Sequence, residues 1–238
     1  MTSPLAERLR QKYFGRDEHP YRTFEREVRS HLTTSQTLLD AGCGRTAPVL
    51  QGFRGQAARL IGIDEVEFTT DLPGIETFNA NLARTGLPDG CVDVIMARSV
   101  VEHLDDPTRV FSEFHRILRP GGVVVFLTAN LWDYASLVAA AVPNRLHPWI
   151  VSRTEGRKEF DVFPTRYRAN TRAAIGRHAS ASGLSIQKLE YLGQYPSYLM
   201  FNGPLFLLGT AYEKLISRFS SLHWLRGWIL CSLKKPIG

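Results

Sequence analysis

The segment from residue 107 to residue 128 constrains the fold most, because its sequence predicts a helix that is followed directly by a buried strand. Between residues 107 and 118 the apolar residues recur with a period of 3.6, and Asp105 or Asp106 can cap the start of this helix. The sequence Arg119-Pro120-Gly121-Gly122 should end it. The run VVVFLT at 123–128 shows no polar alternation, which is typical of a strand in a parallel sheet.

Further strands are expected before and after this pair of elements, with helices between them. N-terminal helices should precede the first strand, and a helix should lie at 171–182. This alternation predicts a doubly wound, Rossmann-like α/β fold with a mostly parallel sheet, an antiparallel C-terminal edge strand, N-terminal helices and a C-terminal helical insertion. The expected strands are 36–40, 58–64, 77–81, 91–97, 123–128, 184–192 and 228–233.

The composition suits one domain with a real core, since 44% of the 238 residues are hydrophobic. The three cysteines are too few for a disulfide framework or a cysteine-rich zinc site, and no metal-ligand cluster is expected. The first 20 residues are charged throughout and lack the apolar core of a signal peptide. We therefore expect a cytoplasmic protein without a metal.

Positive charge is concentrated in the last third of the chain. Residues 145–238 carry 14 basic and 5 acidic side chains, whereas residues 41–144 carry 8 and 12. This excess is either a solvated face or a region that attracts an anionic partner. Nucleic acid is not expected, since no lysine-rich tract or nucleic-acid module is present. Leu205–Leu208 among basic residues leaves peripheral membrane contact open, and oligomeric state is not predicted.

A glycine loop follows the first expected strand and has an acid on each side. In Asp40-Ala41-Gly42-Cys43-Gly44 the glycines allow a tight turn and close approach to a ligand. The pattern also satisfies the dinucleotide motif, but a carboxylate at Asp40 would repel a pyrophosphate and attract a cationic ligand. Asp64 ends the second strand, where an acid can accept hydrogen bonds from ribose hydroxyls.

Four ordered motifs carry a resemblance to a known family. They are LLDAGCG, IGIDE, LPDGCVDVIMARSVVEHLDDP, and EFHRILRPGG followed by VVVFLT. Together they resemble class I S-adenosylmethionine-dependent methyltransferases, specifically the small-molecule branch called methyltransferase type 11. The resemblance covers residues 36–130. It implies one methyltransferase domain over 1–238, with N-terminal helices at 1–35, the cofactor-binding core at 36–130 and acceptor-site segments at 131–168 and 193–225.

The resemblance also implies a set of residues that bind S-adenosylmethionine and its product S-adenosylhomocysteine. Asp40 and the loop would hold the methionine end, and Asp64 with Glu65 would hold the ribose. Asn81 stands where the family usually has an aspartate near the adenine. The implied set is Asp40, Ala41, Gly42, Cys43, Gly44, Asp64, Glu65, Asn81, Leu82 and Arg98.

Methyl transfer to a hydroxyl or amine is helped by a general base. His103, after the fourth strand, and Tyr134, after the fifth, are the catalytic candidates, although either can be a structural side chain. Arg166 and Arg168 could clamp an anionic acceptor, and His147 lies in the same acceptor region. The expected acceptor is therefore a small or lipid-linked molecule that carries an anionic group.

Two other functions remain open at this point. A protein of this fold could bind S-adenosylmethionine without catalysis, as a regulatory or scaffold module. A nicotinamide-dependent oxidoreductase is the other alternative, and Asp40 argues against it.

Overall fold

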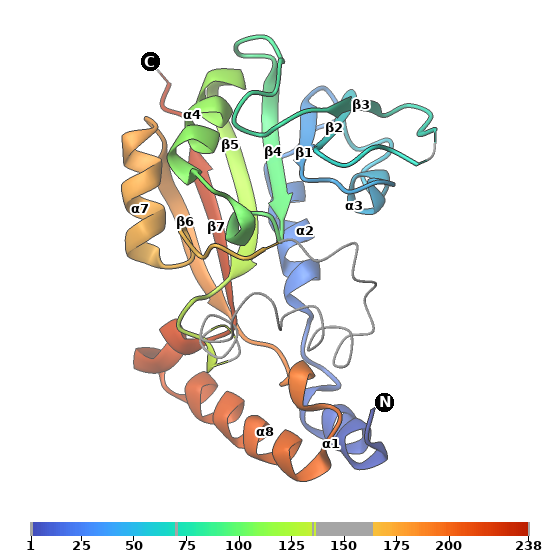
Figure 1. Ribbon diagram of the computed structural model, residues 1–238, viewed down its shortest axis with the longest axis vertical. Helices are drawn as coiled ribbons and strands as arrows, with labels where there is room; N and C mark the ends of the chain where they lie inside the picture. The colour runs from blue at the N-terminus through green and yellow to red at the C-terminus, as the bar shows by residue number, and fades with distance from the viewer. Residues whose placement is uncertain (1, 70, 135, 137–163, 238) are drawn as a thin grey trace. The chain divides into compact units, whose positions relative to one another are not determined.

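The computed structural model describes residues 2–69, 71–134, 136 and 164–237. Seven strands form one mixed sheet in the order β3-β2-β1-β4-β5-β7-β6 (Figure 1). This is the predicted Rossmann-like sheet. The strands are β1 Thr37–Ala41, β2 Arg59–Asp64, β3 Glu76–Asn79, β4 Val92–Arg98, β5 Leu118–Ala129, β6 Ser185–Leu192 and β7 Trp228–Lys234.

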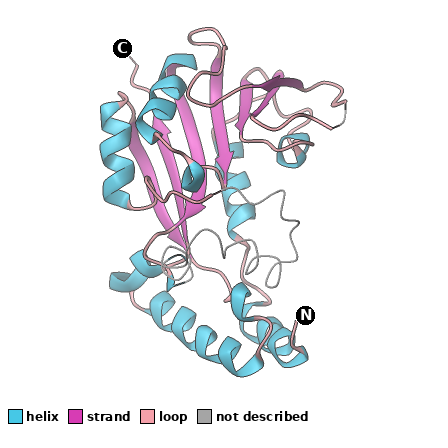
Figure 2. Ribbon diagram, viewed as in Figure 1, coloured by secondary structure: helices cyan, strands magenta, loops and turns pink. Residues whose placement is uncertain are grey.

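Helices occupy the predicted places between these strands (Figure 2). The N-terminal pair is present, and Thr171 caps the helix that was expected at 171–182. The α-helices are α1 Pro4–Phe14, α2 Pro20–Ser30, α3 Pro48–Gln51, α4 Pro107–Ile117, α7 Arg172–Ala181 and α8 Gly203–Arg218; the short 3-10 helices are η1 Val101–His103, η4 Ser197–Leu199 and η5 Ser220–Leu225.

Parallel pairing brings the carboxyl ends of the first strands to one edge of the sheet. β1 pairs in parallel with both β2 and β4, with Asp40 opposite Gly62 on one side and Met96 on the other. Since α/β folds bind ligands outside the carboxyl ends of their strands, the loops after β1, β2 and β4 are the ones that can build a site.

The C-terminal strand β7 runs antiparallel to β5, as predicted. The Gly121 amide donates to the Lys235 carbonyl, and the Lys235 amide donates to the Gly122 carbonyl. The expectation that this strand lies at the edge of the sheet is wrong, because β7 lies between β5 and β6 and the edge strand is β6. β5 already begins at Leu118 because this residue pairs with Val92 of β4, so the Arg-Pro-Gly-Gly segment ends α4 as expected but also belongs to the strand.

The core confirms the apolar stripe predicted on α4. Phe111 and Phe114 are buried, and the Phe111 ring lies 5.9 Å from the Phe126 ring of β5. Asp106 caps the helix by accepting a hydrogen bond from the Arg109 amide at 3.1 Å. Helix and strand are therefore joined by the packing that their sequence periods require.

The chain divides into two compact units. Unit 1 comprises residues 1–20, 129–165 and 191–229, and unit 2 comprises 21–128, 166–190 and 230–238. In unit 1, α8 is the predicted helical insertion, and Phe206 of this helix packs edge-on against Phe14 of α1. Among the described residues, none of the helices combines the length and apolar character needed to cross a membrane.

Candidate active site

The glycine loop after β1 is bound directly to the end of β2. The Gly42 amide donates to the Ile63 carbonyl at 2.8 Å, and the Gly44 amide donates to Asp64 Oδ2 at 2.7 Å. The structure thus brings together the loop and the second acid, as their positions in the sequence suggested. Asp64 Oδ1 also accepts from the Val66 amide at 3.1 Å, so both oxygens of this carboxylate are held by backbone amides.

The two glycines of the loop serve different purposes. Both have a positive φ, +78° at Gly42 and +72° at Gly44, a region that favours glycine. A Cβ atom on Gly42 would lie 2.4 Å from the Val100 side chain, whereas one on Gly44 would meet no atom within 4 Å. Gly42 is therefore needed for packing, and Gly44 leaves open space beside the loop that a ligand could use.

Asp40 is a buried acid at the end of β1. Its side chain is 2% exposed, and Oδ2 has no hydrogen-bond partner within the described part of the chain. Burial raises the pKa of Asp40 to about 7; the Arg98 guanidinium opposes this rise, and the Asp64 carboxylate adds to it. A buried carboxylate oxygen without a partner is costly, so it marks a place where a donor or cation would be stabilised.

Two of the residues implied for the ribose and adenine, Glu65 and Asn81, are hydrogen-bonded to each other. Asn81 donates to Glu65 Oε1 and accepts from the Ala83 amide at 2.7 Å. Leu82 is buried beside them. Asn81 Oδ1 keeps a second lone pair, so it can still accept one further hydrogen bond from a ligand.

The Arg98 side chain is held by helix α2. Its guanidinium lies 4.3 Å from the centre of the Tyr21 ring and 4.0 Å from Glu25 Oε1. The group is therefore oriented by α2 while its charge acts on Asp40. The role implied for Arg98, contact between its main-chain carbonyl and a ligand ammonium, stays a prediction.

Glu102 is a buried acid next to His103 that the sequence analysis did not select. It is 6% exposed and accepts from Thr128 Oγ1 at 2.6 Å, and Thr128 in turn accepts from Asn170 at 2.8 Å. Burial raises the pKa of Glu102, and His103 opposes the rise. An acid inside the apolar run Ser99–Leu104 was the available signal, because such a residue must find buried partners.

His103 ends the short helix after β4, at the edge of the sheet that Asp40 and Asp64 share. Its side chain is partly exposed, and its amide donates to the Val100 carbonyl at 2.9 Å. A general base must lie within hydrogen-bond reach of the proton that it removes, so the catalytic role of His103 stays a prediction.

Asp105 engages both arginines implied for the acceptor. Arg166 Nε lies 2.8 Å from Asp105 Oδ1, and Arg168 donates to the Asp105 carbonyl. The Arg166 amide also donates to the Glu102 carbonyl at 2.7 Å. Residues 166–168 are therefore anchored to the segment that follows β4, close to His103 in the chain.

The remaining two candidates are Tyr134 and His147. Tyr134 lies in unit 1, where its ring is 5.3 Å from the Tyr212 ring. Burial, together with the negative charges of Asp133 and Glu213, raises the pKa of Tyr134 well above its ordinary value, so this phenol is a poor proton acceptor. His147 lies outside the described residues. In the described part of the chain, no three His, Cys, Asp or Glu side chains are grouped as metal ligands.

Comparison with known proteins identifies the domain. Residues 39–126, which contain the glycine loop, Asp64 and His103, match the methyltransferase domain of the type 11 family. The chain contains a type 11 methyltransferase domain. The match begins one residue before Asp40 and ends at Phe126 of β5, so it includes the glycine loop, Asp64, Arg98 and the segment 99–105 after β4, whereas Thr128, Arg166, Arg168 and Asn170 lie beyond it.

Three similar proteins place the domain in context. A probable S-adenosylmethionine-dependent methyltransferase of Mycolicibacterium smegmatis is 36% identical over 111 residues, which cover 42% of this chain and 41% of that protein. A trans-aconitate 2-methyltransferase of Azoarcus is 33% identical over 115 residues, covering 46% and 45%. The chain thus spans less than half the length of these curated relatives.

The third is a crystal structure of geranyl diphosphate C-methyltransferase from Streptomyces coelicolor with S-adenosyl-L-homocysteine bound. It is 16% identical, covers 94% of this chain and 88% of that one, and superposes with a TM-score of 0.56. At this identity the similarity shows that the methyltransferase domain here has the same fold.

Proposed function

We propose that the chain transfers a methyl group from S-adenosylmethionine to a small or lipid-linked acceptor that carries an anionic group. The observation that carries the proposal is Asp40: a buried carboxylate, without a partner on Oδ2 in the described residues, next to a glycine loop. The ammonium of the methionine moiety offers the cation and donors that Asp40 lacks. The relatives named as S-adenosylmethionine-dependent support the same cofactor.

The donors and acceptors around the loop fit this cofactor. Asp40 would hold the ammonium, and Asp64, already oriented by the Gly44 and Val66 amides, would accept from the ribose hydroxyls. Open space beside Gly44 would admit the ligand. When bound, the cofactor supplies a methyl group on a positively charged sulfur, which an acceptor atom can displace in line.

His103 would take the proton from the acceptor. If it is the base, His103→Ala should lower turnover by ~10²–10⁴ while the affinity for S-adenosylhomocysteine stays within about twofold. His115→Ala on α4 is the matched control, because it removes a histidine from the same unit and should leave turnover unchanged. Near-normal turnover of His103→Ala would show that His103 is not the general base and that its role is structural.

An anionic acceptor would bind Arg166 and Arg168. The ion pair between Arg166 and Asp105 is exposed, and such pairs contribute only about 0–1 kcal/mol, so an acceptor carboxylate or phosphate can replace Asp105. The named acceptor of the Azoarcus relative, trans-aconitate, is a carboxylate and supports this class.

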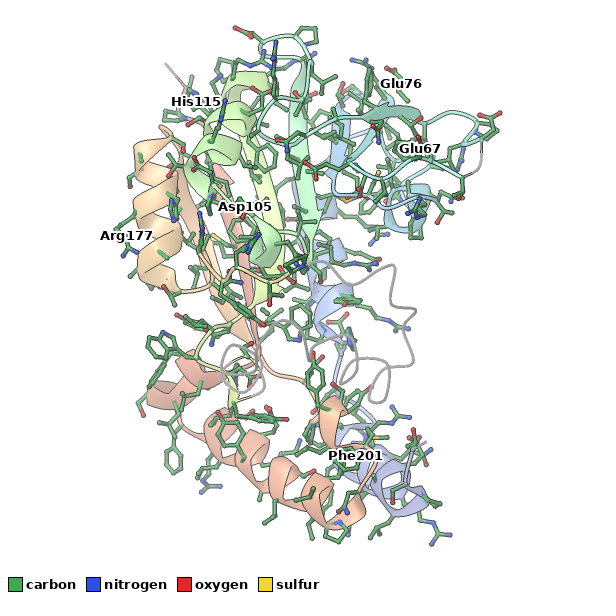
Figure 3. All side chains as sticks on the ribbon, viewed as in Figure 1. Glu67, Glu76, Asp105, His115, Arg177 and Phe201 are labelled. Atoms are coloured by element: carbon green, nitrogen blue, oxygen red, sulfur yellow. The ribbon has the colours of Figure 1, made fainter. Side chains whose placement is uncertain are left out.

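The salt dependence of the Michaelis constant tests the anionic acceptor. Arg166→Ala and Arg168→Ala should raise the constant for the acceptor and weaken its dependence on salt. Arg177→Ala is the control, since this side chain points outward from α7 (Figure 3). A Michaelis constant that is insensitive to salt and unchanged in both variants would contradict the proposal that the acceptor is anionic.

Turnover itself is measured with methyl-labelled S-adenosylmethionine and pools of carboxylate and phosphate acceptors. We expect label in one pool and an equal amount of S-adenosylhomocysteine. Tight binding of the cofactor with no label in any pool would favour the non-catalytic binding protein instead.

A further inference from the structure

Helix α8 in unit 1 carries large apolar side chains on its exposed side and its one acid, Glu213, on its buried side. Four of its leucines are exposed, and Leu208 and Leu215 are 68% and 52% accessible. These two are seven residues apart, so they lie on the same side of the helix. The exposed leucines of α8 are Leu205, Leu207, Leu208 and Leu215.

The opposite side of α8 faces the rest of unit 1. It consists of Gly203, Phe206, Gly209, Thr210, Glu213 and Ile216. Phe206 packs on Phe14 of α1, and Gly209 lies against Pro196 and Leu199. The only acid of the helix, Glu213, is therefore on the buried side. This side of α8 thus makes the packing contacts within unit 1. The leucines on the other side stay exposed in the part of the chain that the structure describes.

Basic and aromatic side chains border the exposed leucines. Lys214 and Arg218 are exposed on the last two turns of α8, and Lys214 also lies 3.4 Å from the Asp17 carboxylate. Phe201 and Phe219 are about half exposed at the two ends of the helix, with Phe201 labelled in Figure 3. Between residues 191 and 229 the sequence contains no acid other than Glu213.

We infer that the exposed side of α8 binds the surface of an anionic membrane, with the helix lying flat in the interface. The leucines would enter the boundary between headgroups and acyl chains, and Arg218 and Lys214 would contact anionic headgroups. The aromatic residues at both ends suit the same boundary. The inference rests on this surface alone and holds whether or not the proposed methyl transfer is correct.

Charge distinguishes a membrane from a second copy of the chain. A second copy would present the same α8 surface, and the one acid of that helix, Glu213, is buried, so α8 itself offers no exposed carboxylate to pair with Arg218. Anionic headgroups supply that opposite charge at every position along the helix. A membrane therefore satisfies both the apolar and the basic side chains, whereas self-association would satisfy the leucines only.

Vesicle co-sedimentation of the full chain tests the inference. We expect binding to vesicles of phosphatidylcholine with phosphatidylglycerol, weaker binding to phosphatidylcholine alone, and release at high salt. Leu208→Glu/Leu215→Glu should weaken binding by about tenfold or more, because it removes apolar burial and adds negative charge. Arg218→Gln should weaken binding to the anionic vesicles by about fivefold. Both sets of substitutions are at exposed positions, and thermal unfolding checks that each variant is folded.

Ile237→Glu is the matched control. Ile237 is exposed in unit 2, so this variant adds an acid at an exposed apolar position of the other unit, and its binding should match that of the wild type. The inference is overturned if the wild type sediments with neither vesicle, or if the double variant binds as tightly as the wild type. A wild type that ignores vesicles but forms a dimer that the double variant breaks would assign the surface to self-association instead.

Discussion

At the scale of single residues, Asp40 links the chemistry of the proposed site to the stability of the protein. Burial makes its negative charge unfavourable, and Arg98 only partly offsets that cost. Asp40 and Asp64 were predictable from the sequence, because acids at strand ends beside a glycine loop form a recognisable pattern. The burial of Asp40 and of Glu102 was not predictable, since burial depends on packing between distant segments.

The raised pKa of Asp40 predicts how stability changes with pH. The folded state keeps the proton up to about pH 7, whereas the unfolded chain loses it near the ordinary pKa of 3.8. The folded state thus binds more protons between these values, so this group lowers stability as pH rises from about 4 to 7. Asp40→Asn should abolish this decrease in the free energy of unfolding, which amounts to up to about 4 kcal/mol.

Urea unfolding of both proteins across this pH range measures the effect. The difference in free energy of unfolding between Asp40→Asn and the wild type should grow in favour of the variant as pH rises to about 7, and then level off. Curves that run parallel from pH 4 to pH 8 would show that Asp40 ionises normally in the folded protein.

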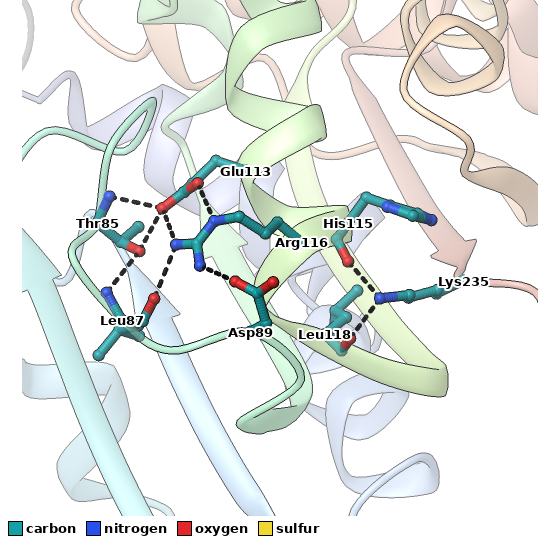
Figure 4. A network of polar contacts seen from close by, with 8 residues as sticks. All are labelled: Thr85, Leu87, Asp89, Glu113, His115, Arg116, Leu118 and Lys235. Carbon is teal, nitrogen blue, oxygen red and sulfur yellow. Dashed lines mark hydrogen bonds and ion pairs between the residues drawn. The ribbon is translucent and has the colours of Figure 1, made fainter.

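At the scale of elements, a polar network fixes helix α4 to the loop before β4 (Figure 4). Arg116 donates to both carboxylate oxygens of Glu113, at 2.7 and 2.8 Å, and to the Leu87 carbonyl at 2.8 Å. The Thr85 amide donates to Glu113 at 2.8 Å. The hydrogen bonds from Arg116, helped by those from Thr85, lower the pKa of Glu113 to about 2.

Glu113→Gln should destabilise the domain by about 1–3 kcal/mol at neutral pH, because it removes the charge that Arg116 binds. The stabilising effect of a lowered carboxyl pKa is present above about pH 4.5 and is lost as pH falls toward 2. The difference between variant and wild type should therefore shrink over that range. Glu67→Gln, in the loop after β2, serves as control. A difference that persists unchanged at pH 2 would mean that the charge of Glu113 does not stabilise the fold.

The elements also show where sequence patterns stop being informative. The stripe of α4 and the apolar runs of β1, β2 and β5 were predictable because their periods match their burial. The bounds of α8 were not, since Pro196, Gly203 and Gly209 suggest breaks and its leucines face outward. Exposed leucines on one side of the helix and a buried glutamate on the other give no ordinary amphipathic signal.

At the scale of the whole molecule, residues 36–130 were predictable as one methyltransferase domain, because four motifs in a fixed order specify both the sheet and the loops at its edge. The two acceptor-site segments were assigned only by their place in the chain. Acceptor pockets vary on a shared scaffold, so the motifs that identify the fold say little about them. That 131–168 and 193–225 contact an acceptor therefore stays a prediction, as does a single domain over 1–238.

Titration calorimetry with S-adenosylhomocysteine tests the central claim, that the loop at 40–44 and Asp64 bind this cofactor. The wild type should bind with micromolar-range affinity, a free energy on the order of −8 kcal/mol. Asp64→Ala should weaken binding by about 1.5–3 kcal/mol, roughly 10- to 100-fold, and Asp71→Ala, an exposed acid outside the loop, should not. No heat with S-adenosylhomocysteine or S-adenosylmethionine, together with binding of a nicotinamide dinucleotide, would contradict the account.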